Sequence, residues 1–353
     1  ALSAPLRLAA APHWQKVVSP HFTIYTDGSA NDARDWAVNL EAFEQSLQQL
    51  FPIDDRSLAP VTVVLFRNDR AFRPFKLRNR SGHADEDEAG VFMQWNGRFL
   101  IAINVSDEET ARRIVFLNAT HWYISAFLRQ IPLWLETGLA EVYSTYIAYG
   151  GHVTVGYPID DCVDAFKVTP LLPLRDLMAV TLGSPYYKVE PNAAFFNAES
   201  WAFVHCLLQG KKGAWRPDLG HFVRLFEAGM GPVDAFTAAF PDGIDGMERS
   251  FDDYVRSGSY ATYVVTTDLA AIEQAVVSGP ASEAEVQVAL ADLYLSQQRN
   301  DEAFAYVLRA AALAPDDVRV LEAQADLALA RGNNDRAIDF YRRAAAAGSR
   351  FYL

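Results

Sequence analysis

The C-terminal part of the chain repeats with a period of 34 residues, and this constrains its fold more than any other feature of the sequence. Counting back from Pro315 gives a first unit over residues 284–317, and adding 34 gives a second over 318–351. The key residues of the first unit are Leu290, Ala291, Tyr294, Ala303, Ala310 and Pro315. Those of the second are Leu321, Ala325, Ala328, Gly332, Ala337, Tyr341 and Ala344. Small and large residues at this spacing interlock two antiparallel helices in each unit.

The two units resemble tetratricopeptide repeats; a generic alanine-rich helical hairpin is the simpler alternative. Two repeats are too few for a free-standing solenoid, so we expect the tail to pack on the preceding domain or on a partner. A helix predicted over Thr267–Val277 would provide that contact with the domain.

In such repeats the first helix of each unit lines a groove that binds peptides. The resemblance places six residues there: Glu285, Val288, Asp292, Arg319, Glu322 and Asp326. Because four of the six are acidic, the groove favours a basic or mixed peptide. The alternative is that they form a solvated helix face.

The overall composition limits the classes of partner. The chain has 353 residues, a formal net charge of −13 and two cysteines, Cys162 and Cys206. A global polyanion argues against nucleic acid or an anionic bilayer as partner, and two cysteines exclude a disulfide-dense scaffold. No apolar run approaches the roughly 18 residues that a membrane span needs. The low proportion of lysine to arginine favours a bacterial protein, and the start at Ala1 is typical of a processed or trimmed N-terminus. An extracytoplasmic or periplasmic location after signal removal is slightly favoured over the cytoplasm.

The rest of the chain divides into an N-terminal tail over 1–13, a mixed α/β part over 14–107 and a mostly helical part over 108–263, followed by the repeat tail over 267–353. In the mixed part, the patterns predict strands over His21–Thr26 and Val61–Phe66, a helix over Asp32–Phe51, and a hairpin turning at Asn96-Gly97. Helices are predicted in the next part over Thr110–Leu128, Leu133–Tyr149, Ala198–Leu208, Asp218–Ala228, Val233–Phe240 and Gly246–Val255.

One stretch carries recognisable chemistry. It reads Leu117-Asn118-Ala119-Thr120-His121, then Pro132-Leu133-Trp134-Leu135-Glu136-Thr137-Gly138-Leu139-Ala140-Glu141. In an H-E-x-x-H peptidase two histidines four residues apart bind zinc, and the intervening glutamate is the general base. The stretch resembles bacterial gluzincin-like metallopeptidases of the peptidase-MA type, which take a third ligand, a glutamate, from the next helix. The resemblance covers roughly residues 14–260. It implies an α+β zincin-like domain with a small mixed sheet and a helical subdomain.

Carried over position by position, the zinc site is degenerate. Leu117 replaces the first histidine, Asn118 the catalytic glutamate and Thr137 the third ligand. His121 remains at the second histidine, and Glu141 at a second acidic position of the family. Asn197 replaces a tyrosine in the family's downstream pattern, here Asn197-Ala198-Glu199-Ser200-Trp201.

The other side chains of this stretch do not replace the missing zinc ligands. A zinc site needs three protein ligands, and leucine, asparagine and threonine are poor ones. One residue along a helix turns a side chain by about 100°, so we expect Glu136 to face away from the lost ligand position. We expect His121 to be buried, with a hydrogen bond to Glu141. No spacing argues for His152, His205 or Glu199 as substitutes.

A basic stretch precedes an acidic loop at Asp85–Glu88. It contains Arg67, Arg70, Arg73, Lys76, Arg78 and Arg80, interleaved with Phe72 and Phe75. In the simpler interpretation, acidic residues of the same chain neutralise these basic side chains. In the more specific one, the basic side chains bind a phosphate-bearing or acidic partner.

The sequence therefore predicts a degenerate gluzincin-like domain fused to two tetratricopeptide repeats. Our leading hypothesis is a pseudopeptidase without cofactor or metal that binds a protein or peptide through its cleft and repeat groove. The alternatives are an active zinc peptidase with a rearranged site that uses His121, Glu136 or Glu141, and a purely structural assembly subunit.

Overall fold

The computed structural model describes residues 13–50, 61–78, 83, 88–127, 130–149 and 152–349. The chain is mixed α/β and forms two compact units. The sheet unit comprises the described residues within 1–38, 59–107 and 274–353. The helical unit comprises those within 39–58 and 108–273. In the described part of the chain, none of the helices has the length and apolar character that crossing a bilayer requires.

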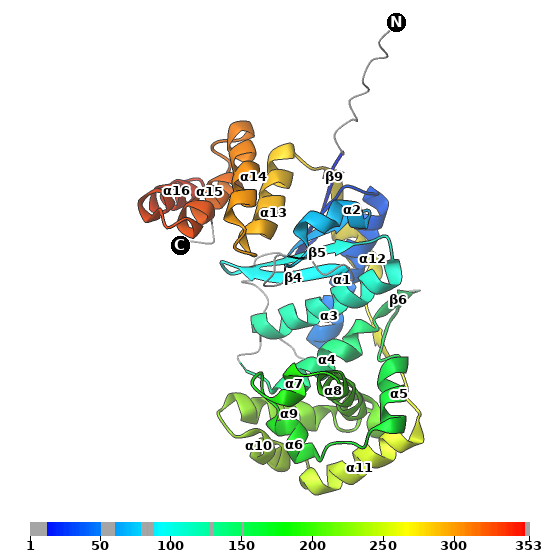
Figure 1. Ribbon diagram of the computed structural model, residues 1–353. Coiled ribbons are helices and arrows are strands. Elements are labelled where there is room, and N and C mark those ends of the chain that lie inside the picture. Colours follow the sequence, from blue (N-terminus) through cyan, green and yellow to red (C-terminus); the bar gives the residue numbers. More distant parts are fainter. Residues whose placement is uncertain are drawn as a thin grey trace, which may run out of the picture. The chain divides into compact units, whose positions relative to one another are not determined.

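The sheet unit is built on a six-stranded mixed sheet in the order β4-β5-β3-β2-β1-β9. Figure 1 labels β4, β5 and β9 of this sheet. Its strands are β1 (Gln15–Val18), β2 (Phe22–Thr26), β3 (Val61–Phe66), β4 (Gly90–Trp95), β5 (Arg98–Asn104) and β9 (Val277–Pro280). Strands β2, β3 and β5 are parallel neighbours, and the other pairs are antiparallel. The β4–β5 hairpin turns at Asn96 and Gly97, both with positive φ, as a two-residue turn requires. The predicted hairpin is therefore confirmed.

Four helices form the C-terminal part of this unit. They are α13 (Glu283–Leu295), α14 (Asn300–Leu313), α15 (Val318–Ala330) and α16 (Asn334–Ala346). Polar side chains cap three of their N-termini. Ser282 and Glu285 form a capping box on α13, while Asp317 and Asn333 accept backbone N–H groups of α15 and α16. Gly332, with φ of 73°, lies in the turn between α15 and α16.

These helices share one hydrophobic core with the sheet. The core joins Phe66, Phe75 and Leu100 of the sheet region to Leu293 and Tyr294 of α13. The Phe75 and Tyr294 rings lie 4.9 Å apart between centroids. Polar contacts fix the same junction, since the Gln297 side chain donates to the Phe75 carbonyl at 2.7 Å and that of Arg299 to the Pro74 carbonyl at 2.7 Å. Of the two expectations for the tail, the structure therefore favours packing on the preceding part of the chain.

Short helical turns lie beside the sheet: α2 (Asp69–Phe72) and η1 (Arg73–Phe75). Helix α1 (Ala30–Leu50) begins in the sheet unit and continues into the helical unit. Helix α12 (Leu269–Ala275) likewise runs across the division between the units.

The helical unit contains nine helices and a small sheet among its described residues. The helices are α3 (Glu108–Phe127), α4 (Leu133–Ser144), α5 (Asp160–Val168), α6 (Leu174–Ala179), α7 (Pro185–Lys188), α8 (Asn192–Gln209), α9 (Arg216–Glu227), α10 (Pro232–Ala239) and α11 (Gly243–Ser257). A short 3-10 turn, η2 (Gly210–Gly213), follows α8. The sheet has the order β6-β7-β8, from β6 (Ile147–Tyr149), β7 (His152–Val155) and β8 (Tyr263–Thr266).

Helix α4 packs against α3 on one side and α8 on the other. Trp134 of α4 and Trp201 of α8 are fully buried, and the Trp134 and Phe203 ring centroids lie 5.0 Å apart. The two helices approach most closely at Gly138. A Cβ atom there would lie 2.3 Å from the Ser200 carbonyl oxygen, so only glycine fits.

Two predicted element boundaries are wrong. The helix predicted over Leu133–Tyr149 ends at Ser144, and Ile147–Tyr149 instead pairs with β7. The Thr145 hydroxyl accepts the N–H groups of Gly156 and Tyr157, which fixes the chain in this reversal. The helix predicted over Thr267–Val277 is shorter, because Val277–Pro280 forms β9 and pairs with β1.

The contact at Gly138 leads to a testable expectation. Gly138→Ala should destabilise the chain by about 1–3 kcal/mol, because the added methyl forces α4 and α8 apart. Gly220→Ala is the matched control. That helical position has no atom closer than 3.7 Å to an added Cβ, so the change should stabilise by about 0.5–1 kcal/mol. Urea unfolding followed by circular dichroism measures both, and equal effects would contradict the close approach.

Candidate functional site

The residues that the peptidase resemblance aligns with zinc-ligand positions lie on α3 and α4 of the helical unit. Nδ1 of His121 lies 3.0 Å from Oε1 of Glu136, and both side chains are about one-third exposed. Three expectations are thereby corrected, since His121 is not buried, its partner is not Glu141, and Glu136 faces the site instead of away from it. Glu136 lies against His121 because α3 and α4 pack together. The angle between neighbouring side chains along α4 alone could not predict this contact, since it depends on how the second helix is placed.

These residues do not fit a zinc ion. The Asn118 side chain donates to the Ile114 carbonyl at 2.8 Å, so its amide is bonded within its own helix. Leu117 has no donor atom, and a threonine such as Thr137 is a poor zinc ligand. In the described part of the chain, no cluster of three metal-ligating side chains includes His121. His121 and Glu136 thus supply two ligand atoms where a catalytic zinc needs three.

Glu141 has a different partner from the one expected. Its carboxylate accepts a hydrogen bond from Nη2 of Arg113 at 3.3 Å, between α4 and α3. Burial raises the pKa of Glu141 above its ordinary value, and Arg113 and His121 oppose that rise. The Arg113–Glu141 pair connects the degenerate site to a neighbouring pocket.

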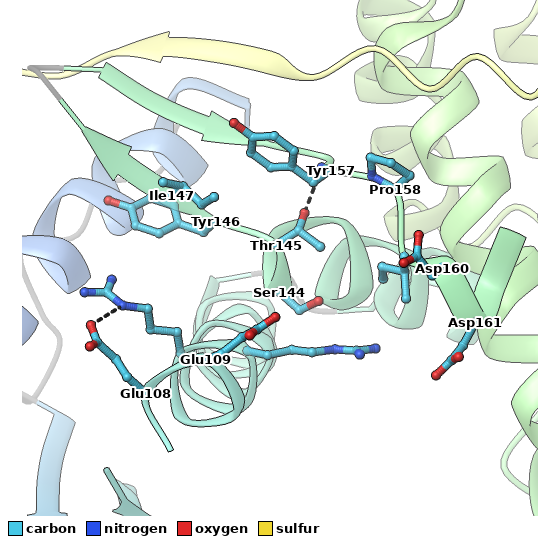
Figure 2. Close-up of a pocket in the computed structure, with 13 residues that line it drawn as sticks. Glu108, Glu109, Ser144, Thr145, Tyr146, Ile147, Tyr157, Pro158, Asp160 and Asp161 are labelled. Atoms are coloured by element: carbon cyan, nitrogen blue, oxygen red, sulfur yellow. Dashed lines mark hydrogen bonds and ion pairs between the residues drawn. The ribbon is translucent and has the colours of Figure 1, made fainter. Parts of the chain in front are cut away.

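That pocket, the α3–α4 pocket, has a volume of about 700 Å³. Figure 2 shows Tyr146, Ile147 and Tyr157 on one side, with Asp160 and Asp161 on the other. The complete lining is Glu108, Glu109, Arg112, Arg113, Ser144, Thr145, Tyr146, Ile147, Tyr157, Pro158, Ile159, Asp160 and Asp161. Its volume lies in the range of about 300–1,000 Å³ that ligand pockets occupy.

Several elements position these side chains. Glu108 and Glu109 begin α3, and Asp160 and Asp161 begin α5, where negative side chains favour a helix N-terminus. Thr145 holds the loop that carries Tyr157 through its two backbone hydrogen bonds. Ile147 begins β6, an edge strand of the small sheet. The pocket thus combines an apolar wall, an acidic rim and a strand edge.

Acidic side chains outnumber basic ones around the α3–α4 pocket. Arg112 bonds Glu108 at 3.0 Å, and Arg113 bonds Glu141, so both basic side chains already have acidic partners. Four of the lining residues are acidic and two are basic. The pocket therefore favours a cationic ligand.

The downstream motif lies on α8. Asn197 is half-buried, while Glu199 is fully buried with no hydrogen-bond partner for either carboxylate oxygen among the described residues. Burial raises the pKa of Glu199 to about 8. Glu199 is therefore mostly protonated at pH 7.

The other candidate side chains have structural roles. His205 is buried, and its ring nitrogens contact Tyr254 Oη at 2.7 Å and the Gly156 carbonyl at 2.8 Å. Burial raises the pKa of both Cys162 and Cys206 to about 12, so neither thiol supplies a nucleophile near neutral pH. His152 is exposed on β7.

Glu199 makes the stability of the chain depend on pH. Its folded pKa of about 8 exceeds the ordinary 4.5, so its neutral form stabilises the fold below pH 4.5, and this contribution is lost as pH rises through 8. Between pH 5 and 9, Glu199→Gln should become more stable relative to wild type by roughly 3–5 kcal/mol. Denaturant titrations across this range measure the difference.

Glu109→Gln, at an exposed position, serves as the control and should show no such trend. A constant stability difference between Glu199→Gln and wild type over pH 5–9 would contradict the buried neutral acid.

The six residues predicted for the repeat groove lie together in the sheet unit, and they face the chain's own sheet. Asp292, Glu322 and Asp326 are fully buried, so they do not form a solvated helix face. Nη1 of Arg98, a β5 residue that is 4% exposed, donates to Asp326 at 2.9 Å, and its Nη2 donates to Glu322 at 2.8 Å.

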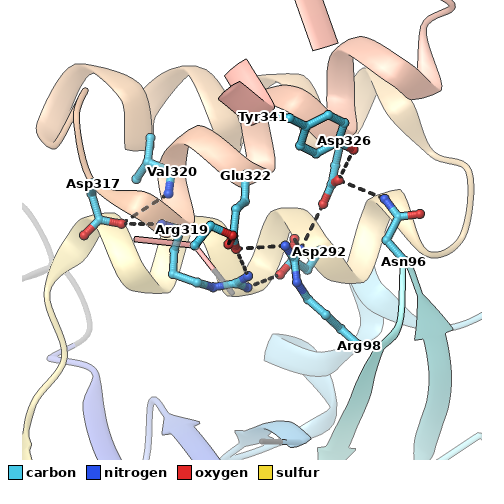
Figure 3. A network of polar contacts seen from close by, with 10 residues as sticks. Asn96, Arg98, Asp292, Asp317, Arg319, Val320, Glu322, Asp326 and Tyr341 are labelled. Carbon is cyan, nitrogen blue, oxygen red and sulfur yellow. Dashed lines mark hydrogen bonds and ion pairs between the residues drawn. The ribbon is translucent and has the colours of Figure 1, made fainter. Parts of the chain in front are cut away.

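Other side chains complete this network (Figure 3). Arg319 donates to Asp292 at 2.8 Å and to Glu322 at 2.6 Å. Asn96 and Tyr341 both donate to Asp326. Burial raises the pKa of Asp292, and Arg319 and Arg98 oppose the rise.

The two remaining residues of the predicted groove lie beside this network. Lys16 of β1 forms an ion pair with Glu285, and Val288 lines a small cavity of about 240 Å³ with Arg98 and Arg319. The chain's own sheet therefore supplies basic partners to the acidic repeat helices, at the place where the sequence predicts a peptide.

The basic stretch is largely neutralised within the sheet unit. Arg67 pairs with Asp27, Arg73 and Lys76 with Asp69, and Arg78 with Glu302. Lys76 is buried, with its ammonium 5.9 Å from the centre of the Phe72 ring. Arg70 lines a surface pocket, whereas Arg80 and residues 85–87 of the acidic loop lie outside the described residues.

Removal of Arg98 tests the network. Arg98→Ala should destabilise the chain by about 3–5 kcal/mol, because it leaves buried carboxylates without their partner. The triple variant with Arg98→Met, Glu322→Gln and Asp326→Asn should regain part of that loss, since it removes two of the three buried carboxylates as well and leaves Asp292 paired with Arg319. Chemical denaturation measures these changes.

Arg256→Ala is the matched control, because it removes an exposed arginine paired four residues away with Asp252, and it should cost less than about 0.5 kcal/mol. An Arg98→Ala variant as stable as this control would show that the network contributes little.

No protein-family model matches the chain, and no curated protein matches it significantly. The peptidase and repeat resemblances therefore rest on the residues quoted from the sequence. Arg98 and most of the pocket lining were not predicted from it. The only sequence signal for Arg98 is its position directly after the Asn96-Gly97 turn.

Proposed function

We propose that the chain is a non-catalytic pseudopeptidase that binds an extended, basic segment of a protein or peptide in the α3–α4 pocket. The observation that carries this proposal is an open pocket of about 700 Å³ beside a site whose metal-binding positions hold Leu117, Asn118 and Thr137. A pocket of this size next to an incomplete catalytic set is suited to binding without chemistry.

Three features favour an extended peptide. Strand β6 is at the edge of its sheet, so an added strand can hydrogen-bond to its backbone. Tyr146, Ile147 and Tyr157 supply apolar contacts for alternate side chains. Glu109, Asp160 and Asp161 are acidic rim residues suited to lysine or arginine side chains.

Lack of catalysis has its own support. An H-E-x-x-H mechanism needs a carboxylate as general base beside the first histidine, and this chain has Asn118 there, with its amide bonded to a helix carbonyl. The repeat helices, which we interpret as tetratricopeptide repeats, stabilise the sheet unit in this proposal and do not present their usual groove.

Peptide binding is tested with the full chain and fluorescent peptides. A ten-residue probe that alternates valine with lysine should bind more tightly than the same probe with glutamate in place of lysine. Tyr157→Ala, and separately the double variant Asp160→Asn with Asp161→Asn, should weaken binding of the lysine probe by about fivefold or more.

The controls are chosen for similar exposure. Tyr186→Ala removes a tyrosine as exposed as Tyr157, at 39%, outside the pocket, and Asp253→Asn removes a distant exposed acid. Both should leave the dissociation constant within about twofold of wild type. Equal binding of the lysine and glutamate probes, or equal losses in variants and controls, would contradict the pocket as the site.

Catalysis is tested separately by mass spectrometry of the lysine probe after incubation with the chain and zinc. The probe should remain intact, and metal analysis after dialysis should find no stoichiometric zinc. Zinc-dependent cleavage that His121→Ala abolishes would overturn the non-catalytic assignment in favour of the rearranged peptidase.

A further inference from the structure

The second helices of the two repeat units form an apolar groove in the sheet unit, which we call the α14–α16 groove. It has a volume of about 310 Å³, with α15 contributing between α14 and α16. Phe304 and Leu308 line it from α14, Leu327 from α15, and Phe340 from α16. Phe304 is 43% exposed and Leu308 is 59% exposed, so apolar surface lies open to water here.

The groove is distinct from the surface that the repeat helices present to the sheet. The Arg98 network joins β5 to α13 and α15. Its members do not line the α14–α16 groove. A ligand in the groove therefore does not have to displace Arg98.

The charges at the groove are of one sign. Among its eleven lining residues none is acidic, and two are arginines, Arg331 and Arg336. Arg331 pairs with Asp301 at 2.9 Å, but the Asp301 side chain is 97% exposed, so this pair is weak and exchangeable. A ligand carboxylate can replace it at small cost.

Both arginines lie over aromatic rings on opposite walls. The Arg331 guanidinium lies 4.4 Å from the centre of the Phe304 ring, and that of Arg336 lies 5.9 Å from the Phe340 ring. Stacking on a ring leaves the guanidinium edge facing outward, where it can donate to a carboxylate; in Arg331 the Nη2 atom of that edge now donates to Asp301 at 2.9 Å and to the Asn300 carbonyl at 3.4 Å. Each wall thus combines an apolar face with a carboxylate-binding edge.

We propose that the α14–α16 groove binds an amphipathic helix of a partner protein whose apolar anchor residues are flanked by aspartate or glutamate. The anchors fill the space beside Leu308 and Leu327, and the flanking carboxylates bond Arg331 and Arg336. An apolar groove between helices that receives a helix is a recurrent mode of recognition, with anchors three or four residues apart. This site is independent of the α3–α4 pocket and selects the opposite ligand charge.

The test uses the full chain and three labelled helical peptides of about sixteen residues, a length at which an isolated helix is marginally stable. Each has leucines at positions i and i+4, and the flanking residues are glutamate, glutamine or lysine. The glutamate peptide should bind most tightly in fluorescence polarisation, and the lysine peptide least.

Matched variants locate the site. Leu308→Asp and Arg336→Glu should each weaken binding of the glutamate peptide by about tenfold. Leu313→Asp on α14 and Arg342→Glu on α16 introduce the same changes at exposed positions that do not line the groove, and should change binding less than about twofold. Circular dichroism verifies that all four variants stay folded.

Three results would overturn the proposal. They are no binding of the glutamate peptide, equal binding of the glutamate and lysine peptides, and equal losses in groove and control variants. A fourth such result would come from light scattering. If the wild-type chain is a dimer and Leu308→Asp makes it a monomer, a second copy of the chain occupies the groove. The α3–α4 pocket variants should not affect binding of the glutamate peptide. The proposals for the two sites are therefore tested independently.

Discussion

The buried guanidinium of Arg98 is the interaction on which the sheet unit depends. It lies between carboxylates of α15 and close to Asp292 of α13, so one strand residue joins two repeat units. Burying charge is costly unless each group finds partners, and here Arg319, Asn96 and Tyr341 supply most of the remaining hydrogen bonds. Two helical hairpins thus share one hydrophobic core with a sheet.

This arrangement determines which surfaces remain for partners. Because the first helices of the repeats face β5, an external peptide would have to displace Arg98 from the predicted groove. Two of the open surfaces among the described residues are the α3–α4 pocket and the α14–α16 groove, which differ in the charge of their rims. A chain with a net charge of −13 can therefore offer one site to a basic segment and another to an acidic one. The two proposals thus assign ligands of opposite charge to separate surfaces.

Local patterns predicted much of the fold, since strand and helix periodicities depend on neighbouring residues. The strand at Val61–Phe66 and the hairpin turn at Asn96-Gly97 were predicted correctly. The end of α4 was not, because Thr145 fixes the chain through backbone groups of Gly156 and Tyr157 that lie more than ten residues away. Contacts between residues far apart in the sequence also explain why the geometry of the candidate site was not predicted. The sequence identified His121 and Glu136, but their contact arises from the packing of two helices, and the partner of Asp326 lies 228 residues earlier in the chain.

Hydrogen exchange of the intact chain tests most directly whether the repeat helices and the sheet form one cooperative body. Amides of β5, α13 and α15 should lose protection with the same opening free energy and the same dependence on denaturant, because neither part retains its core without the other. If α13 and α15 instead opened at a lower free energy while β5 stayed protected, the repeats would be an independent module. Arg98 would then not be the link that closes the repeat groove.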